Sequence, residues 1–335
     1  TTRDHLPEAL RLVAQLFHDA SFPAAEFEEL KRQTLTAMQA QLDNPQELSR
    51  DALTAHFNTY PPGDPRYHAQ LTERIEQLRQ TTLEQVTAYH RQLIGTARGE
   101  IAIVGDFDEK AIVDELKRLF PEYVSRSPYG RVDREYRKVD PQRLVIDTPD
   151  KENAFVRARL DLMLRDDDPD APALYLANDI FGGTTGLSSR LLDRLRQKDG
   201  LSYSVGSSLS VGSREHLSTW TFAAMAAPQN ANRAEQAFLE ELRRARADGF
   251  TAEEVAEAKK GLLQARAVER SQDGAVASRW VSFLDLGRDW QFSKDFEDKI
   301  MALTQERVNA AFRKYIDPEQ LTLVVATDVS KGNAN

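Results

Sequence analysis

Two stretches of this sequence recur later in the chain, in the same order and at nearly the same spacing. The stretch that begins at Phe22, FPAAEFEELKRQTL, matches FTAEEVAEAKKGLL, which begins at Phe250. Further on, TTLEQVTAYHRQLI and IAIVGD match LTQERVNAAFRKYI and LVVATD. The first match has an offset of 228 residues and the second an offset of 222, so a gap of six residues separates them. One amphipathic match alone is a common coincidence, but two in the same order indicate a duplicated structural unit.

The repeat predicts two domains, for which a chain of 335 residues is long enough. We expect a first domain over residues 1–125, a linker with few apolar residues over residues 126–140, and a second domain over residues 141–335. In the second copy about 90 residues precede the matched helices, whereas almost none do so in the first. The first domain is therefore expected to be truncated at its N-terminal side.

The spacing of apolar residues predicts a mixture of helices and strands. The expected helices cover residues 6–18, 24–41, 46–57, 71–78, 83–94, 109–119, 170–181, 230–247, 252–268, 275–286 and 304–315. The expected strands cover residues 99–108, 143–149, 152–164, 201–211, 216–227 and 321–327. Helical hairpins, rather than regular strand–helix–strand units, separate these strands. We therefore expect an α+β fold of two repeated domains, each a mainly antiparallel sheet with helices packed on one face.

The composition excludes several classes of function. Acidic residues outnumber basic residues by 53 to 44, and this net charge of −9 argues against nucleic acid as the partner. No apolar run approaches the roughly 18 to 20 residues that a membrane-spanning helix needs, so no membrane span is expected. The chain has no cysteine, which excludes disulfides and metal sites built on thiolates.

The stretch GGTTGLSSRLLDRLRQKDGLSYSVGSS, residues 182–208, combines a Gly-rich start, an amphipathic helix, a helix stop and a strand. Either Ser188 or Ser189 can cap the helix, and Gly200 supplies the left-handed residue that ends it. The apolar residues of this helix recur at 3.6-residue spacing: Leu187, Leu191, Leu192 and Leu195.

A strand follows this helix directly. Alternate residues of the strand share one face: Leu201, Tyr203, Val205, Ser207 and Leu209. Arg196, near the end of the helix, and Tyr203, near the start of the strand, therefore flank a helix-to-strand corner. Taken alone, Arg196 only favours the negative end of its helix, and Tyr203 is an ordinary strand aromatic.

The pattern GLSSRLLDRLRQKDGLSYSV resembles the substrate-binding segment of the pitrilysin or insulinase family of zinc metallopeptidases. In that family an Arg/Tyr pair with this spacing lies in the half of the molecule that lacks the metal. The resemblance implies that Arg196 and Tyr203 bind the backbone or the C-terminal carboxylate of a peptide substrate. The planar fork of arginine and the hydroxyl of tyrosine both suit oxygen acceptors.

The catalytic pattern of the family, an inverted His-x-x-Glu-His, does not occur in this sequence. The six histidines are too widely spaced to place two ligands on one helical turn: His5, His18, His56, His68, His90 and His216. The third ligand of the family, a glutamate, falls on Ala37, and the nearby Glu29 would need a register shifted by two turns. The resemblance thus implies no catalytic residue and no metal here, with zinc in a catalytic half on the same chain or on a partner chain.

Two functions from different classes remain. The first is the substrate-binding, non-catalytic half of a zinc metallopeptidase, a type of protein for which the resemblance favours the bacterial periplasm. The alternative is a non-enzymatic assembly or scaffold subunit on the same fold. A His-x-x-Glu-His motif in an adjacent domain or in a partner chain distinguishes the two, since only the peptidase requires it.

Overall fold

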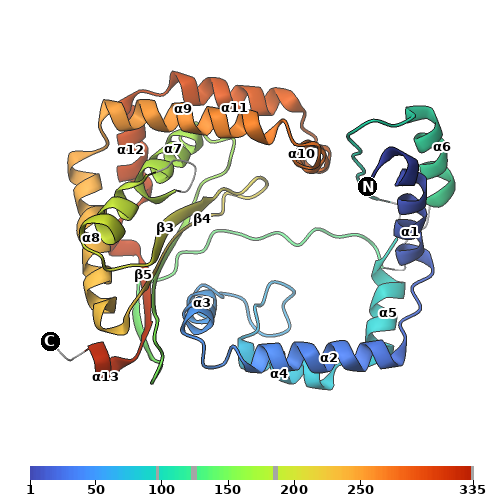
Figure 1. Ribbon diagram of the computed structural model, residues 1–335, viewed down its shortest axis with the longest axis horizontal. Helices are drawn as coiled ribbons and strands as arrows, with labels where there is room; N and C mark the ends of the chain where they lie inside the picture. Colours follow the sequence, from blue (N-terminus) through green and yellow to red (C-terminus); the bar gives the residue numbers. More distant parts are fainter. Residues whose placement is uncertain (96–97, 122–126, 184–187, 333–335) are drawn as a thin grey trace. The chain divides into compact units, whose positions relative to one another are not determined.

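The computed structural model describes residues 1–95, 98–121, 127–183 and 188–332 (Figure 1). The contacts of the chain divide it into two compact units. The first unit comprises Thr1–Gln39, Thr72–Arg131 and Glu269–Asp289, and the second comprises Ala40–Leu71, Val132–Val268 and Trp290–Asn335. The domain boundaries expected from the sequence stay a prediction, and the one between residues 125 and 126 falls outside the described residues.

The regular elements of the first unit are all helices within its described residues. Its helices are η1 (Arg3–His5), α1 (Leu6–His18), α2 (Ala24–Gln39), α4 (Leu71–Gln80, apart from its first residue), α5 (Leu83–Leu93), α6 (Glu109–Leu119) and α10 (Asp273–Leu286). Helices α1 and α6 pack together through the edge-to-face rings of Phe17 and Phe120, whose centroids are 5.9 Å apart. Helix α5 begins at a capping box, in which Thr82 and Gln85 each bond the backbone amide of the other.

The strand expected over residues 99–108 is wrong. Among the described residues this segment forms no strand, and Ile101 within it is 51% exposed. A strand exists only where a neighbouring backbone pairs with its amide and carbonyl groups. No described strand pairs with this segment, so its alternating apolar residues have no sheet to join.

All strands of the described residues lie in one mixed sheet of the second unit. They are β1 (Arg143–Asp147), β2 (Ala154–Leu162), β3 (Ser204–Ser210), β4 (Ser218–Ala226) and β5 (Thr322–Thr327). Their order in the sheet is β1-β5-β2-β4-β3, with β1 and β5 parallel and all other pairs antiparallel. The mainly antiparallel sheet of the second domain is thus confirmed, but a pair of repeated sheet domains is not.

The main core lies between one face of this sheet and a layer of helices (Figure 1). The helices of the second unit are α3 (Pro45–His56), α7 (Ala171–Gly182), η2 (Leu192–Lys198), η3 (Pro228–Asn230), α8 (Ala231–Asp248), α9 (Ala252–Glu269, apart from its last residue), α11 (Trp290–Ala302), α12 (Gln305–Tyr315), η4 (Pro318–Gln320) and α13 (Val329–Gly332). Phe222 of β4 stacks on Phe238 of α8 with ring centroids 3.7 Å apart. Close aromatic packing of this kind contributes stability beyond the burial of its area.

The expectation that helices cover only one face of the sheet is wrong, because α3 packs on the opposite face. The Nε of Arg157 on β2 donates to Ser49 Oγ of α3 at 2.9 Å. Val324 of β5 pairs with Arg157 in the sheet, so it lies on the same face, and it is fully buried. The arginines at alternate positions of β2 suggest that this face of the sheet is exposed to solvent. The burial of Val324 on the same face shows that α3 covers it.

The two matched sequence segments make the same local contacts, each within its own unit. Lys31 donates through Nζ to the carbonyls of Arg79 and Thr81, at 2.8 and 2.7 Å. Its match, Lys259, donates to the carbonyls of Met301 and Leu303, at 3.0 and 2.5 Å. These two residues match Arg79 and Thr81 at the offset of 222 residues.

A pair of aromatic rings is also common to both segments. The Phe22 and His90 rings are 5.1 Å apart at an angle of 72°. The Phe250 and Phe312 rings, at the matching positions, are 5.0 Å apart at an angle of 70°. The sequence match therefore extends to contacts between the helices.

Within the described residues, no helix has both the length and the apolar character to cross a bilayer.

We expect the carboxylate of Asp328, which ties the end of β5 to the loop between β1 and β2 and to α13, to give the free energy of unfolding a pH dependence on the acid side. It accepts the backbone amides of Ser330 and Asp150 at 3.0 and 3.1 Å. The Ser330 hydroxyl, with the Asp150 amide and Lys331, lowers the pKa of Asp328 from 3.8 to about 2, against the effect of burial. Because the folded-state pKa is the lower one, this stabilisation is present above pH 3.8 and is lost as the pH falls toward 2.

Urea unfolding midpoints at pH 5 and at pH 2.5 test this expectation. The midpoint should fall more steeply with pH in the wild type than in Asp328→Asn, which has no charge to lose. Equal slopes for the two proteins would show that Asp328 does not carry the effect.

Candidate functional site

The helix that carries Arg196 is π-helical over η2, which differs from the expected 3.6-residue spacing. The amide of Asp199 donates to the carbonyl of Arg194, five residues earlier, at 3.2 Å. Of the expected apolar positions, Leu191 and Leu195 are buried and Leu192 is half-buried. Residues four apart lie close to one face in either type of helix, so the leucine spacing does not distinguish the two types. The expected first leucine, Leu187, lies outside the described residues.

The expected helix signals are found at both ends. The Oγ of Ser189 accepts the amide of Leu192 at 3.4 Å, so Ser189 provides the cap. The Ser188 hydroxyl instead donates to the Asp193 carboxylate at 2.5 Å. Gly200 has a φ of +60°, which confirms the left-handed residue expected there.

The backbone folds back on itself at the corner. The amides of Leu201 and Ser202 both donate to the carbonyl of Leu195, at 2.8 and 3.2 Å. Leu195 immediately precedes Arg196, and Ser202 immediately precedes Tyr203. The structure therefore brings the backbones of the two predicted site residues to one corner. The amide of Tyr203 is held as well, by the carbonyl of Met225 on β4 at 2.9 Å.

The side chains of Arg196 and Tyr203 are exposed at this corner. Strand β3 begins only at Ser204, so the expectation that Tyr203 lies within the strand is wrong, and Tyr203 is 61% exposed. The hydrogen bonds that close the corner hold residues 201–203 out of the strand that the sequence predicts there. Within the described part of the chain, neither side chain has a hydrogen bond or an ion pair. Their donors are thus available to an external acceptor.

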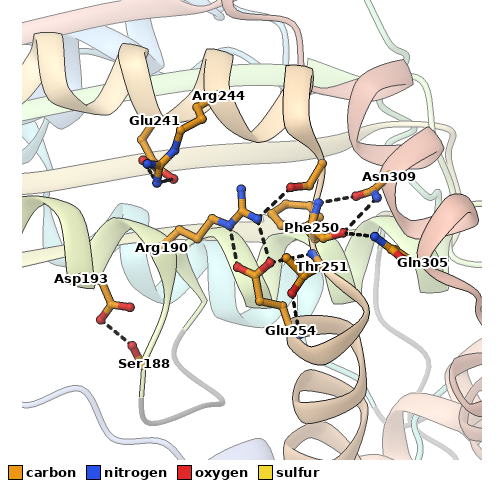
Figure 2. A network of polar contacts seen from close by, with 11 residues as sticks. Ser188, Arg190, Asp193, Glu241, Arg244, Phe250, Thr251, Glu254, Gln305 and Asn309 are labelled. Atoms are coloured by element: carbon orange, nitrogen blue, oxygen red, sulfur yellow. Dashed lines mark hydrogen bonds and ion pairs between the residues drawn. The ribbon is translucent and has the colours of Figure 1, made fainter.

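A polar network fixes the start of this helix to the loop between α8 and α9 (Figure 2). The guanidinium of Arg190 donates to both carboxylate oxygens of Glu254, at 2.6 and 2.7 Å, and to the carbonyl of Gly249 at 2.8 Å. It also lies over the ring of Phe250, 4.8 Å from the centroid. Such paired hydrogen bonds fix direction as well as distance.

Glu254 is itself held in place by Thr251. The amide of Thr251 donates to the Glu254 carboxylate at 2.7 Å, and the Thr251 hydroxyl accepts the amide of Glu254 at 3.2 Å. Burial raises the pKa of Glu254, but the hydrogen bonds from Arg190 and Thr251 outweigh it, and the net pKa is lowered. The Thr-x-x-Glu spacing is a recognisable capping box, so half of this network has a sequence signal. Its partner Arg190 has none.

The loop is also fixed from the side of α12. The amide of Phe250 donates to Asn309 Oδ1 at 2.7 Å, and the carbonyl of Phe250 accepts both Asn309 Nδ2 and Gln305 Nε2, at 3.1 and 2.9 Å. A hollow of about 460 Å³ lies beside this network, lined in part by Arg190, Arg194 and Thr251. Neither Arg196 nor Tyr203 lines it, so the corner and the hollow are separate features.

The described residues contain no group of three histidine, aspartate or glutamate side chains that could hold a metal. Ala37 lies in α2, where its methyl group offers no ligand. Glu29, the shifted alternative, pairs with Arg32 of its own helix at 2.6 Å, and that contact lowers its pKa.

Gly200 provides a test of the corner that involves no side-chain contact. A Cβ at Gly200 would meet nothing within 4 Å, so the positive φ alone opposes substitution. Gly200→Ala should lower the free energy of unfolding by about 1–2 kcal/mol, while Gly200→Asn should cost less, since asparagine tolerates this conformation. Gly261→Ala, inside α9 and also in open space, is the control and should raise stability by about 0.5–1 kcal/mol. Denaturant unfolding measures all three, and equal costs for Ala and Asn at position 200 would contradict the conformational account.

Comparison with known proteins places the chain in a family. The peptidase M16 inactive domain matches residues 80–262, more than half of the sequence. No curated protein matches the chain. The resemblance to the pitrilysin and insulinase peptidases is confirmed by this family match.

Solved structures share the fold over nearly the whole chain. The peptidase M16 inactive domain from Pseudomonas fluorescens has 22% identity and a TM-score of 0.76, covering 97% of this chain and 75% of its own. A protease from Helicobacter pylori has 17% identity and a TM-score of 0.79, with coverages of 98% and 78%. The periplasmic protease PqqL from Escherichia coli has 18% identity and a TM-score of 0.73, with coverages of 98% and 35%. With its fold shared by these proteins and more than half of its sequence matched, this chain belongs to the family of the peptidase M16 inactive domain.

Proposed function

We propose that this chain is the substrate-binding, non-catalytic half of a zinc-dependent metallopeptidase. One observation carries the proposal: the carbonyl of Leu195 accepts the amide of Ser202, which sets Arg196 and Tyr203 at one corner with exposed side chains. Membership of an inactive-domain family supports the absence of a catalytic centre from this half.

The corner offers two kinds of donor to a peptide. The guanidinium of Arg196 suits a carboxylate or a pair of carbonyl oxygens, and the hydroxyl of Tyr203 donates one hydrogen bond. Both suit the backbone or the C-terminus of a peptide, whatever its side chains. A catalytic half, on the same chain or on a partner chain, would hold the zinc, which would supply the activation of water and the polarisation of the scissile carbonyl.

The first prediction from this proposal concerns the two side chains. In the complete peptidase, Arg196→Ala should lower peptide turnover at substrate concentrations below KM on the order of ten- to a hundredfold and Tyr203→Phe by up to about tenfold, since each loses a hydrogen bond to the substrate and so raises KM. Zinc content and melting temperature should stay nearly unchanged. Lys198→Ala, which removes an exposed cation from the same helix, is the matched control and should leave turnover intact.

The double variant Arg196→Ala/Tyr203→Phe should lose less than the sum of the single losses if both side chains grip one segment of peptide. Unchanged turnover per folded molecule in both single variants would defeat the proposal. The scaffold function would then be the better account, and no partner with a His-x-x-Glu-His motif should be found.

We also propose that the two matched segments are copies of one structural unit. Support comes from the shared lysine contacts, which join α2 to the turn before α5 and α9 to the turn before α12, and from the shared ring pair. If so, Lys31→Met and Lys259→Met should each lower the free energy of unfolding by about 1.5–3 kcal/mol, the worth of a hydrogen bond from a charged donor. Lys260→Met, at the exposed neighbouring position, should have little effect. Chemical denaturation of the three variants decides, and a loss at only one of the two matched lysines would argue against equivalence.

A further inference from the structure

The segment that displays Arg196 has a backbone that needs support. π-Helices are rare, are mostly confined to single turns, and occur often at functional sites. In η2 this conformation continues over Leu192–Lys198. A backbone in an uncommon conformation persists only when contacts with its surroundings hold it there.

Two arginines of the segment form such contacts. Arg190, just before η2, grips Glu254 with two hydrogen bonds and the Gly249 carbonyl with a third, and its side chain is only 15% exposed. Arg194, inside η2, donates to Asp199 at 2.7 Å and to Glu240 of α8 at 3.2 Å. Arg190 is the stronger anchor because its acceptors are themselves fixed by Thr251, Asn309 and Gln305, as Figure 2 shows.

The first unit contains the matched helical hairpin, formed by α2 and the helices α4 and α5 that follow it, without this anchor. Glu26 of α2 matches Glu254, but it is exposed, and it has no hydrogen bond or ion pair among the residues that the structure describes. Pro23 stands where Thr251 completes the capping box. The ring pair and the lysine contacts are nevertheless present in that unit. The hairpin therefore forms without an arginine on its glutamate, which leaves the Arg190–Glu254 pair free for another role.

We propose that Arg190 is a positioning residue for the substrate-binding corner. Paired with Glu254, it holds the π-helical segment so that Arg196 and Tyr203 present their donors together. This inference rests on the proposed function of those two residues. Arg190 itself touches no substrate: its guanidinium is turned to Glu254, Gly249 and Phe250.

A second arginine pair of the same unit provides a matched control. Arg266 donates to Glu297 at 2.8 Å and lies over Phe296, 4.9 Å from the ring centroid. Its side chain is 16% exposed, so its burial and stacking resemble those of Arg190. It joins α9 to α11, neither of which carries the corner. A variant of Arg266 therefore reports the general cost of breaking such a pair.

The experiment compares Arg190→Gln, Glu254→Gln and Arg266→Gln in the complete protein. Glu254→Gln keeps the capping box, because glutamine also serves at that position, and so is the variant that best preserves the fold. Hydrogen exchange of the amides from Leu192 to Ser202 should become at least about tenfold faster in the two variants of the anchor, and should not change in Arg266→Gln. The peptide KM should rise on the order of tenfold in those same two variants, with kcat little changed.

A double variant then tests whether Arg190 acts through Arg196. In the Arg196→Ala background, Arg190→Gln should raise KM no further, because the group that it positions is gone. Unchanged exchange over Leu192–Ser202, or an equal rise in Arg266→Gln, would overturn the proposal. So would faster exchange with an unchanged KM, provided that Arg196→Ala raises KM. If Arg196→Ala itself leaves KM unchanged, the proposed function fails, and the positioning of a binding corner falls with it, whereas the exchange data still show whether Arg190 holds the segment.

Discussion

Strand β5 is the constraint on which the second unit depends. It is the last of the described strands in sequence, yet it lies inside the sheet, between β1 on one side and β2 on the other. All of its residues are buried, because the main core covers one face and α3 covers the other. Pairing between strands so far apart in sequence carries a large cost in loop entropy before it returns any stabilisation. The sheet is therefore complete only when β5 has paired with β1 and β2, which lie much earlier in the sequence.

The sheet holds in place the strand that follows the corner of Arg196 and Tyr203. Asn178 of α7 accepts through Oδ1 both the hydroxyl of Ser207 on β3 and the indole N–H of Trp220 on β4, each at 2.8 Å. A Cβ at Gly182, the last residue of α7, would lie 2.5 Å from the Ser207 hydroxyl, so only glycine allows this approach. Strand β3 is thus fixed to both α7 and β4, and Tyr203 precedes it directly.

Sequence patterns predict the parts of this structure that follow a simple period. The amphipathic helices, the strands of the second unit, the Ser189 cap and the left-handed Gly200 all depend on local chemistry that the residues display. The cover of α3 over β2 and the exposed segment at Ile101 depend on which partner is present, and an apolar alternation is the same with or without one. The π-helix is hidden because Leu191 and Leu195 suit either helix. The pairing of Arg190 with Glu254 joins residues 64 positions apart, and only the capping-box half of it is local.

The two compact units are interleaved along the chain. The sequence passes from one to the other at residues 39–40, 71–72, 131–132, 268–269 and 289–290. Each unit is therefore assembled from three separate stretches, and α4 and α9 each begin in one unit and end in the other. A contiguous piece of the gene does not encode either unit whole. Each matched repeat is one contiguous stretch of sequence, which recombination can exchange as a block. Neither compact unit is contiguous, so recombination at a single boundary cannot exchange a whole unit.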